Sequence, residues 1–180
     1  MTGFVLRPLR AADRDVVHQL TMESLDHLRP WMPWAANYDL DSAAEFVEQV
    51  EAGWAGGHSS TYLILDGDEA AGVCALHRSI GPGGLEIGYW LHPERTGRGL
   101  ATRATAALVG HAFSHPDIDH VQIWHDAANV ASAAVPKRLA FTQVDRRTPP
   151  RDPLTPGEVG IDVIWQLDRL DELDRLDRLE

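Results

Sequence analysis

The order of apolar segments in this chain predicts a single α/β domain. Its 180 residues suit one domain, since a domain of roughly 150 residues buries about 70% of its unfolded surface. Segments with helical spacing of apolar residues alternate with segments typical of strands. A glycine-rich turn at 96–101 joins an apolar strand-like run directly to an Ala/Leu-rich helical run. These three observations indicate a central sheet with helices packed against it.

The first half of the chain carries two helix signals and then becomes rich in strands. Pro30 and Pro33 end the first helix, and Asp41 or Ser42 can cap the second. The turn at 66–68, Asp-Gly-Asp, is typical of a hairpin. The expected elements are a strand at 5–7, a helix at 11–28, a helix at 41–54, and strands at 61–65, 70–80 and 85–91.

The second half alternates helix and strand. Its first helix places Leu100, Ala104 and Leu108 on one stripe, which we expect to face the sheet. Four prolines in the segment 148–156 predict an extended loop. The expected elements are a helix at 99–113, a strand at 121–124, a helix at 130–139, and strands at 141–144 and 159–167.

The last residues differ in composition from the rest. From Leu167 onward leucine recurs at every third position, separated by Asp, Glu and Arg. A period of three drifts around a helix of 3.6 residues per turn, so no straight apolar face forms. We therefore divide the chain into a domain at 1–167 and a charged tail at 168–180. A helix used for self-association, and hence a homodimer, is the alternative reading of this tail.

Charge and cysteine content exclude several classes of protein. The net charge of −11 argues against nucleic-acid binding and is compatible with a cationic partner. No run approaches the roughly 20 apolar residues that span a bilayer, and no signal peptide is recognisable, so we expect a cytoplasmic protein with no membrane contact. Cys74 stands alone, and the histidines lack metal-ligand spacing. We therefore expect no disulfide and no metal site.

The glycine-rich turn is the strongest functional signal. Glycines allow close approach of a ligand to the backbone, and the following helix directs unpaired N–H groups at the same point. Thr96-Gly97-Arg98-Gly99-Leu100-Ala101 therefore predicts a pyrophosphate cradle, with a ligand-free strand-to-helix connection as the alternative. The segment lacks the Lys and Ser/Thr of a P-loop and the glycine spacing of a dinucleotide fingerprint.

Together with Leu85-Glu86-Ile87-Gly88-Tyr89-Trp90-Leu91-His92-Pro93, this turn resembles the acetyl-CoA signature of the GNAT acetyltransferase superfamily. The branch that acetylates ribosomal-protein N-termini, with its small-molecule relatives, is the most similar. The segments 5–9, 27–34 and 129–141 resemble that branch in the same order. The resemblance implies a mixed, mostly antiparallel sheet with splayed central strands. It also implies acetyl-CoA as cofactor and a primary amine, of a protein N-terminus or a small molecule, as acceptor.

Glu86 is the candidate general base. On a strand it shares one face with Gly88 and Trp90, so the glycine leaves room beside the carboxylate for an amine or a water. Burial would raise its pKa toward a basic role. The resembling family often uses a glutamate on this strand as base, and an ion pair with an arginine is the alternative role.

The resemblance also implies the remaining site residues. Ser132, or water, would protonate the departing thiolate, because Pro136 stands where the superfamily often has a tyrosine. Trp31, Trp34 and Trp90 would line the acceptor side, unless they serve only as core. The expected cofactor contacts are Leu91, His92, Arg95, Gly97, Arg98, Gly99, Leu100, Ala101, Thr102 and Asn129.

Pro136 also predicts an irregular helix. A proline cannot donate to the carbonyl four residues earlier, which is that of Ser132. We expect the helix to kink or to start late, and the freed carbonyl to need water or the pantetheine amide as partner.

Two other functions remain open at this point. A catalytically silent acyl-CoA-binding module is favoured if Glu86 is held in an ion pair. A nucleotide-binding domain would need a nucleoside pocket beyond the cradle.

Overall fold

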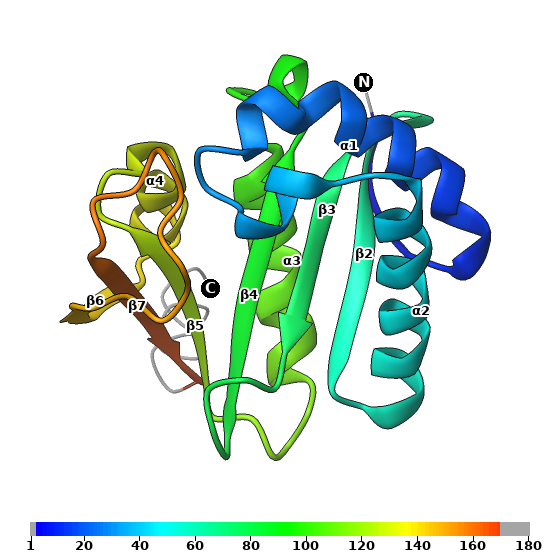
Figure 1. Ribbon diagram of the computed structural model, residues 1–180. Helices are drawn as coiled ribbons and strands as arrows, with labels where there is room; N and C mark the ends of the chain where they lie inside the picture. Colours follow the sequence, from blue (N-terminus) through cyan, green and yellow to red (C-terminus); the bar gives the residue numbers. More distant parts are fainter. Residues whose placement is uncertain (1–2, 170–180) are drawn as a thin grey trace.

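Seven strands form one open sheet in the order β1-β2-β3-β4-β5-β7-β6. The computed structural model describes residues 3–169 (Figure 1). All neighbouring strands are antiparallel except β4 and β5, which are parallel. The mixed, mostly antiparallel sheet is therefore confirmed. The strands are β1 (Phe4–Pro8), β2 (Ser59–Asp66), β3 (Glu69–His77), β4 (Gly84–Leu91), β5 (His120–Asp126), β6 (Thr142–Arg147) and β7 (Asp162–Asp168).

Helices cover both faces of this sheet. The α-helices are α1 (Arg14–Leu28), α2 (Leu40–Gly56), α3 (Leu100–Phe113) and α4 (Val130–Arg138), and short 3₁₀ turns are η1 (Ala11–Asp13), η2 (Pro33–Asn37) and η3 (Pro93–Arg95). Figure 1 shows α1 and α2 in front of the sheet and α3 behind it. The larger core cluster packs α3 on the sheet through Leu100, Ala104 and Leu108, as the apolar stripe predicts. A smaller cluster joins α1 and α2 to the opposite face.

The two central strands separate along their length. Pairing of β4 with β5 covers only Gly84–Glu86, opposite His120–Gln122. Residues 87–91 of β4 remain paired with β3 but have no registered partner on β5, and the two ribbons diverge in Figure 1. The predicted splay is therefore confirmed. It leaves one edge of β4 with backbone groups that no strand pairs.

Several element boundaries differ from expectation, and at two of them side chains that satisfy the backbone give the reason. The α2 helix begins at Leu40, since Asp39 accepts the N–H of Ser42 at 2.8 Å, so the predicted caps at Asp41 or Ser42 were wrong. The β7 strand begins at Asp162, later than predicted. The carboxylate of Asp126 accepts the N–H groups of residues 159–161 at 2.8 to 3.1 Å and holds them outside the ladder.

The folded part reaches slightly beyond residue 167. The β7 strand includes Asp168, and the Arg169 guanidinium donates to the carbonyls of Phe113 and Ile118 at 2.6 and 2.8 Å. These contacts tie the chain to the end of α3. The rest of the expected charged tail, at 170–180, and its self-association lie outside the described residues.

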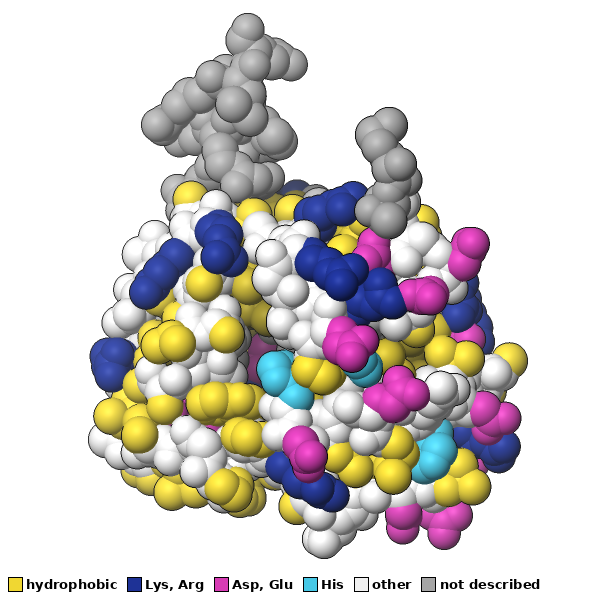
Figure 2. Space-filling model, turned by 90° about the horizontal axis from the view of Figure 1, so that it is seen from above, with side chains coloured by type: hydrophobic (Ala, Val, Ile, Leu, Met, Phe, Trp, Pro, Cys, Tyr) yellow, Lys and Arg dark blue, Asp and Glu magenta, His cyan; other side chains and the backbone are white. Residues whose placement is uncertain are grey.

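The surface shown from above in Figure 2 carries basic and acidic side chains interspersed with one another. Within residues 3–169, no helix has the length and apolar character needed to cross a membrane.

Candidate functional site

Two cavities lie on either side of the splayed half of β4. One, of about 630 Å³, lies between the glycine-rich loop and the start of α4, and we call it the loop-side cavity. The other, of about 560 Å³, lies between the sheet and helices α1 and α2, and we call it the helix-side cavity. Met32, Tyr89 and Trp90 line both. The two cavities therefore meet at the end of β4.

The glycine-rich loop presents open backbone to the loop-side cavity. Gly97 and Gly99 adopt left-handed conformations, with φ of 73° and 74°. A Cβ at either position would meet no protein atom within 4 Å, so a ligand can approach the backbone there. Gly99 is the N-cap of α3, and the first helical N–H groups after it have no partner within the helix. This arrangement fits a pyrophosphate group.

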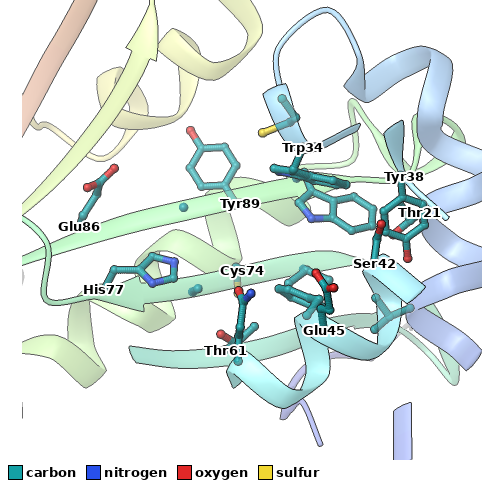
Figure 3. Close-up of a pocket in the computed structure, with 18 residues that line it drawn as sticks. Thr21, Trp34, Tyr38, Ser42, Glu45, Thr61, Cys74, His77, Glu86 and Tyr89 are labelled. Carbon is teal, nitrogen blue, oxygen red and sulfur yellow. The ribbon is translucent and has the colours of Figure 1, made fainter. Parts of the chain in front are cut away.

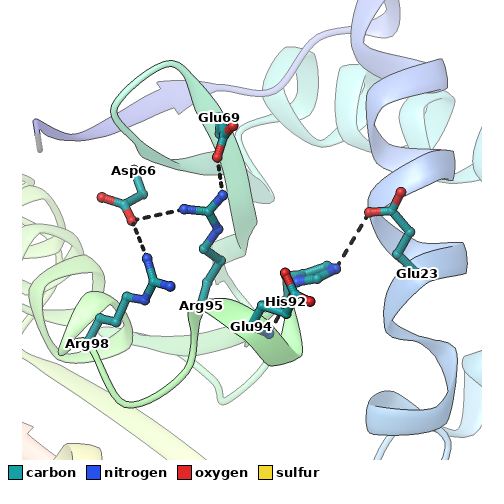
Figure 4. Close-up of polar contacts among 7 residues, drawn as sticks. All are labelled: Glu23, Asp66, Glu69, His92, Glu94, Arg95 and Arg98. Carbon is teal, nitrogen blue, oxygen red and sulfur yellow. Dashed lines mark hydrogen bonds and ion pairs between the residues drawn. The ribbon is translucent and has the colours of Figure 1, made fainter.

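Two arginines of the loop point toward a carboxylate pair instead of the cavity. Arg95 and Arg98 contact Asp66 at 3.4 and 3.3 Å, and Arg95 also pairs with Glu69 (Figure 4). Neither arginine lines the loop-side cavity. Both arginines form ion pairs that tie the loop to the β2–β3 hairpin, and their contacts with phosphate charge stay a prediction.

Two basic side chains of the helices reach the cavity. Arg103 and Arg138 line it, and the Arg103 guanidinium also lies 4.4 Å above the Phe4 ring. Arg138, in the last turn of α4, belongs to no motif that would reveal it in the sequence. His92 does not line the cavity, and its Nε2 lies 3.5 Å from the Glu23 carboxylate (Figure 4). The remaining expected cofactor residues that line it are Leu91, Leu100, Ala101, Thr102 and Asn129.

The start of α4 reaches the same cavity. Asn129 Oδ1 accepts the Ser132 N–H at 3.0 Å and caps the helix, so α4 begins at Val130 and the expected late start was wrong. Pro136 lies inside the helix. The Tyr89 hydroxyl lies 3.1 Å from the Ser132 carbonyl oxygen, to which it donates, and 3.2 Å from Ser132 Oγ. The partner of the freed carbonyl is therefore a tyrosine of β4, not water or a cofactor amide.

Tyr89 is a functional candidate that sequence reasoning missed. Alternation along the strand places it on the face opposite Glu86, where it reads as core. Burial raises the pKa of its hydroxyl to about 12, against the lowering effect of the Ser132 hydrogen bond. The hydroxyl therefore stays protonated throughout the neutral range and can donate a hydrogen bond. The only feature of the sequence that could have revealed Tyr89 was its position on the strand expected to separate from its neighbour.

The floor of the helix-side cavity is built from three cross-strand pairs of β3 and β4. The central pair consists of small residues, and a Cβ at Gly88 would meet no atom within 4 Å. A slot therefore crosses the floor between larger side chains. The pairs are Val73 with Trp90, Ala75 with Gly88, and His77 with Glu86.

The two ends of this cavity differ in chemistry (Figure 3). Trp34 and Tyr38 lie at one end, and His77 and Glu86 at the other. The Trp34 ring centroid lies 6.2 Å from that of Trp90 and 6.0 Å from that of Tyr38. Of the three tryptophans expected on the acceptor side, Trp34 and Trp90 line the helix-side cavity, whereas Trp31 lines the loop-side cavity.

Glu86 is held in an ion pair. Both of its carboxylate oxygens accept hydrogen bonds from the Arg151 guanidinium at 2.8 Å, and Ser79 Oγ donates at 2.6 Å. The guanidinium also lies 4.5 Å above the Trp124 ring. Burial of Glu86 would raise its pKa, but these hydrogen bonds outweigh burial and lower it. The expected rise in the pKa of Glu86 was therefore wrong, and the alternative ion pair is observed.

The residue types at the two cavities suit organic ligands. Among residues 3–169, no group of three or more His, Cys, Asp or Glu side chains is placed to hold a metal ion.

Comparison with known proteins places this arrangement in a family. A model described as "Acetyltransferase (GNAT) domain" matches residues 4–142. The curated Bacillus subtilis (strain 168) protein "Putative ribosomal N-acetyltransferase YdaF" is 29% identical over 147 residues, which cover 77% of each chain.

Solved structures share the fold. RimL, described as a ribosomal L7/L12 α-N-protein acetyltransferase in complex with coenzyme A, superposes with a TM-score of 0.84 at 24% identity. That match covers 93% of this chain and 95% of RimL. MccE, a microcin C7 self-immunity acetyltransferase in complex with acetyl-CoA and AMP, gives a TM-score of 0.83 at 19% identity and covers 92% of both chains.

Proposed function

Since this chain belongs to the GNAT acetyltransferase family and is an acetyl-CoA-dependent N-acetyltransferase, we propose that its acceptor is the primary amine of a protein N-terminus. The observation that carries the proposal is the meeting of two cavities at Tyr89 and Trp90. One cavity has the open glycine backbone that suits a pyrophosphate, and the other has a slot that suits an extended chain. A thioester in the first and an amine in the second would meet at the end of β4.

The loop-side cavity would hold the donor. The N–H groups of 97–102 would bind the pyrophosphate, with Arg103 and Arg138 supplying positive charge. The edge of β4 at 87–91, which β5 leaves unpaired, would form hydrogen bonds with the amide groups of the pantetheine arm, as it would with an added strand. Acetyl-CoA supplies an acetyl thioester, and Asn129 and Ser132 would lie near its sulfur.

The helix-side cavity would hold the acceptor. The small side chains of its floor at Ala75 and Gly88 leave room for a peptide backbone, and Trp34 and Trp90 offer apolar surface for the residues that follow the amine. YdaF is described as a putative ribosomal N-acetyltransferase and RimL as a ribosomal L7/L12 α-N-protein acetyltransferase, which favours a protein N-terminus. A ribosomal acceptor would place the reaction in the cytoplasm. A small-molecule amine is the second acceptor class, since the small-molecule relatives of the branch that the sequence resembles acetylate such amines.

The transfer would proceed by direct attack. The amine nitrogen forms a bond to the carbonyl carbon and the C–S bond breaks, while a backbone N–H near 90–92 would stabilise the oxyanion. Ser132 would give its proton to the thiolate and regain one through water, while the Tyr89 hydroxyl, 3.2 Å from Ser132 Oγ, would hold the side chain in place. The chain has one cysteine, Cys74, which is buried and whose pKa burial raises to about 12. This favours a mechanism without an acetyl-cysteine intermediate.

Glu86 would serve the acceptor side as a carboxylate that attracts the ammonium, not as a strong base. Its ion pair with Arg151 is the specific observation that favours the alternative function, a silent acyl-CoA-binding module.

Thiol release from acetyl-CoA tests these functions. The acceptors are peptides beginning with Ser or Ala, the same peptides with a blocked N-terminus, polyamines and aminoglycosides. We expect turnover with the free peptides and none with the blocked ones. Tight binding of acetyl-CoA without turnover on any acceptor would support the silent module.

A further inference from the structure

We propose that His77 is the group that takes the proton from the acceptor ammonium. The inference rests on the proposed function, because it assumes an amine in the helix-side cavity. Direct attack needs a neutral amine, whereas an α-amino group with a pKa of about 8 is mostly protonated at neutral pH. A proton acceptor must therefore lie within reach of the slot.

His77 occupies the right place for this role. It lies on β3 directly opposite Glu86, one cross-strand pair from the slot formed by Ala75 and Gly88. Directly opposed side chains of an antiparallel pair lie on the same face of the sheet. His77 lines the cavity, and Figure 3 shows its ring beside Glu86 at one end. An ammonium in the slot could therefore contact the imidazole directly or through one water.

Glu86 is less suited to the same task. The Arg151 guanidinium occupies both of its oxygens, and Ser79 donates to one of them. A carboxylate stabilised in this way has little affinity for a proton. It can still attract the ammonium toward the end of the cavity where His77 lies.

The surroundings of His77 favour a neutral imidazole. Burial lowers its pKa, and Arg151 lowers it further, while the Glu86 charge raises it. Glu45 of α2 is the other charged group that lines the cavity, and neutral Ser59 lies opposite His77 on β2. At neutral pH the ring is therefore able to accept a proton. His77 is also exposed to solvent at the end of β3, which gives the proton a way out.

The groups already described account for every proton in the reaction. The ammonium gives one proton to His77 and becomes the nucleophile. Formation of the C–N bond and cleavage of the C–S bond follow, with the thiolate protonated by Ser132. The second amine proton is lost as the amide forms and reprotonates Ser132 through water. The imidazolium returns its proton to solvent.

The pH dependence of kcat/KM tests the proposal in the full chain, with a serine-initiated peptide at saturating acetyl-CoA. His77→Gln should lower kcat/KM about 10²-fold at pH 7, the usual scale for a general base. The loss should shrink above pH 8, where the amine becomes neutral in solution without help. His58→Gln is the matched control, because His58 is an exposed histidine next to β2 that lines neither cavity. An equal loss at every pH, or none, overturns the proposal.

A second measurement does not depend on turnover. Proton NMR follows the imidazole titrations of the coenzyme A complex with and without the peptide, and His77→Gln assigns the His77 signal. The bound ammonium should lower the pKa of His77. Peptide-induced shifts at the Trp34 indole without any at His77 overturn the proposal. A peptide that is not acetylated and shifts no signal contradicts the proposed acceptor instead.

Discussion

Replacing Tyr89 with phenylalanine should destabilise the protein, because Pro136 has removed the usual partner of a helix carbonyl. In α4 the carbonyl of Ser132 receives no N–H from Pro136, and the Tyr89 hydroxyl bonds it at 3.1 Å. Tyr89 and Ser132 are both half-buried, so without the hydroxyl the carbonyl loses its protein partner at a part-buried position. An unsatisfied acceptor costs about 1–3 kcal/mol when it is buried, and at this position we expect Tyr89→Phe to lower the free energy of unfolding by about 1 kcal/mol, the lower end of that range.

A double-mutant cycle isolates this interaction. In Pro136→Ala, residue 136 regains an N–H that can donate to the Ser132 carbonyl. Tyr89→Phe should then cost little in that background, which gives a coupling of roughly 1 kcal/mol. The free energies of unfolding of all four proteins come from urea denaturation. The cycle also cancels the packing lost with the buried proline ring. A coupling within about 0.3 kcal/mol of zero, the usual error of additivity, would refute the reasoning.

Four further outcomes are expected. Gly99→Val should weaken coenzyme A binding about tenfold or more in calorimetric titration. The left-handed φ of Gly99 strains a β-branched residue, and the valine side chain would fill the space that the ligand needs. Gly110→Ala, inside α3, is the control and should leave the affinity unchanged. Asp66→Asn should weaken that binding by less, about two- to fivefold, since it loosens both arginines of the loop. Burial raises the pKa of Asp126, but the backbone N–H groups that it accepts outweigh burial and lower it. Ionised Asp126 therefore stabilises the fold above an unfolded pKa of about 3.9, and this stabilisation is lost as the pH falls through the lower pKa of the folded state. Asp126→Asn should therefore flatten the loss of stability measured between about pH 5 and pH 3. Cys74 should react with a thiol reagent at pH 8 only after denaturation, because its pKa of about 12 leaves little thiolate.

Features encoded by neighbouring residues could be predicted from the sequence. The left-handed glycines before α3 and the Asn129 cap each depend on a few consecutive residues. The splay of the central strands was predictable only through the family resemblance, since pairing between strands is a property of the whole sheet.

Contacts between distant segments could not be predicted. Arg151 reaches Glu86 from 65 residues away, and Tyr89 reaches Ser132 across 43 residues. The expected rise in the pKa of Glu86 followed from burial alone and missed this guanidinium. The loop arginines show the same limit, because nothing local reveals that the β2–β3 hairpin brings Asp66 to them. Charged side chains find their partners through the tertiary fold, and their roles are the least visible in sequence.

The most direct test of the account is the crystal structure of this chain with a bisubstrate conjugate, in which coenzyme A is joined through an acetyl linker to the α-nitrogen of a serine-initiated peptide. We predict that the pyrophosphate lies on the loop at 97–102, the linker crosses at Tyr89 and Trp90, and the peptide nitrogen lies over Gly88 within hydrogen-bonding reach of His77, directly or through one water. A conjugate whose peptide leaves the loop-side cavity by another route, with the helix-side cavity empty, would contradict the account.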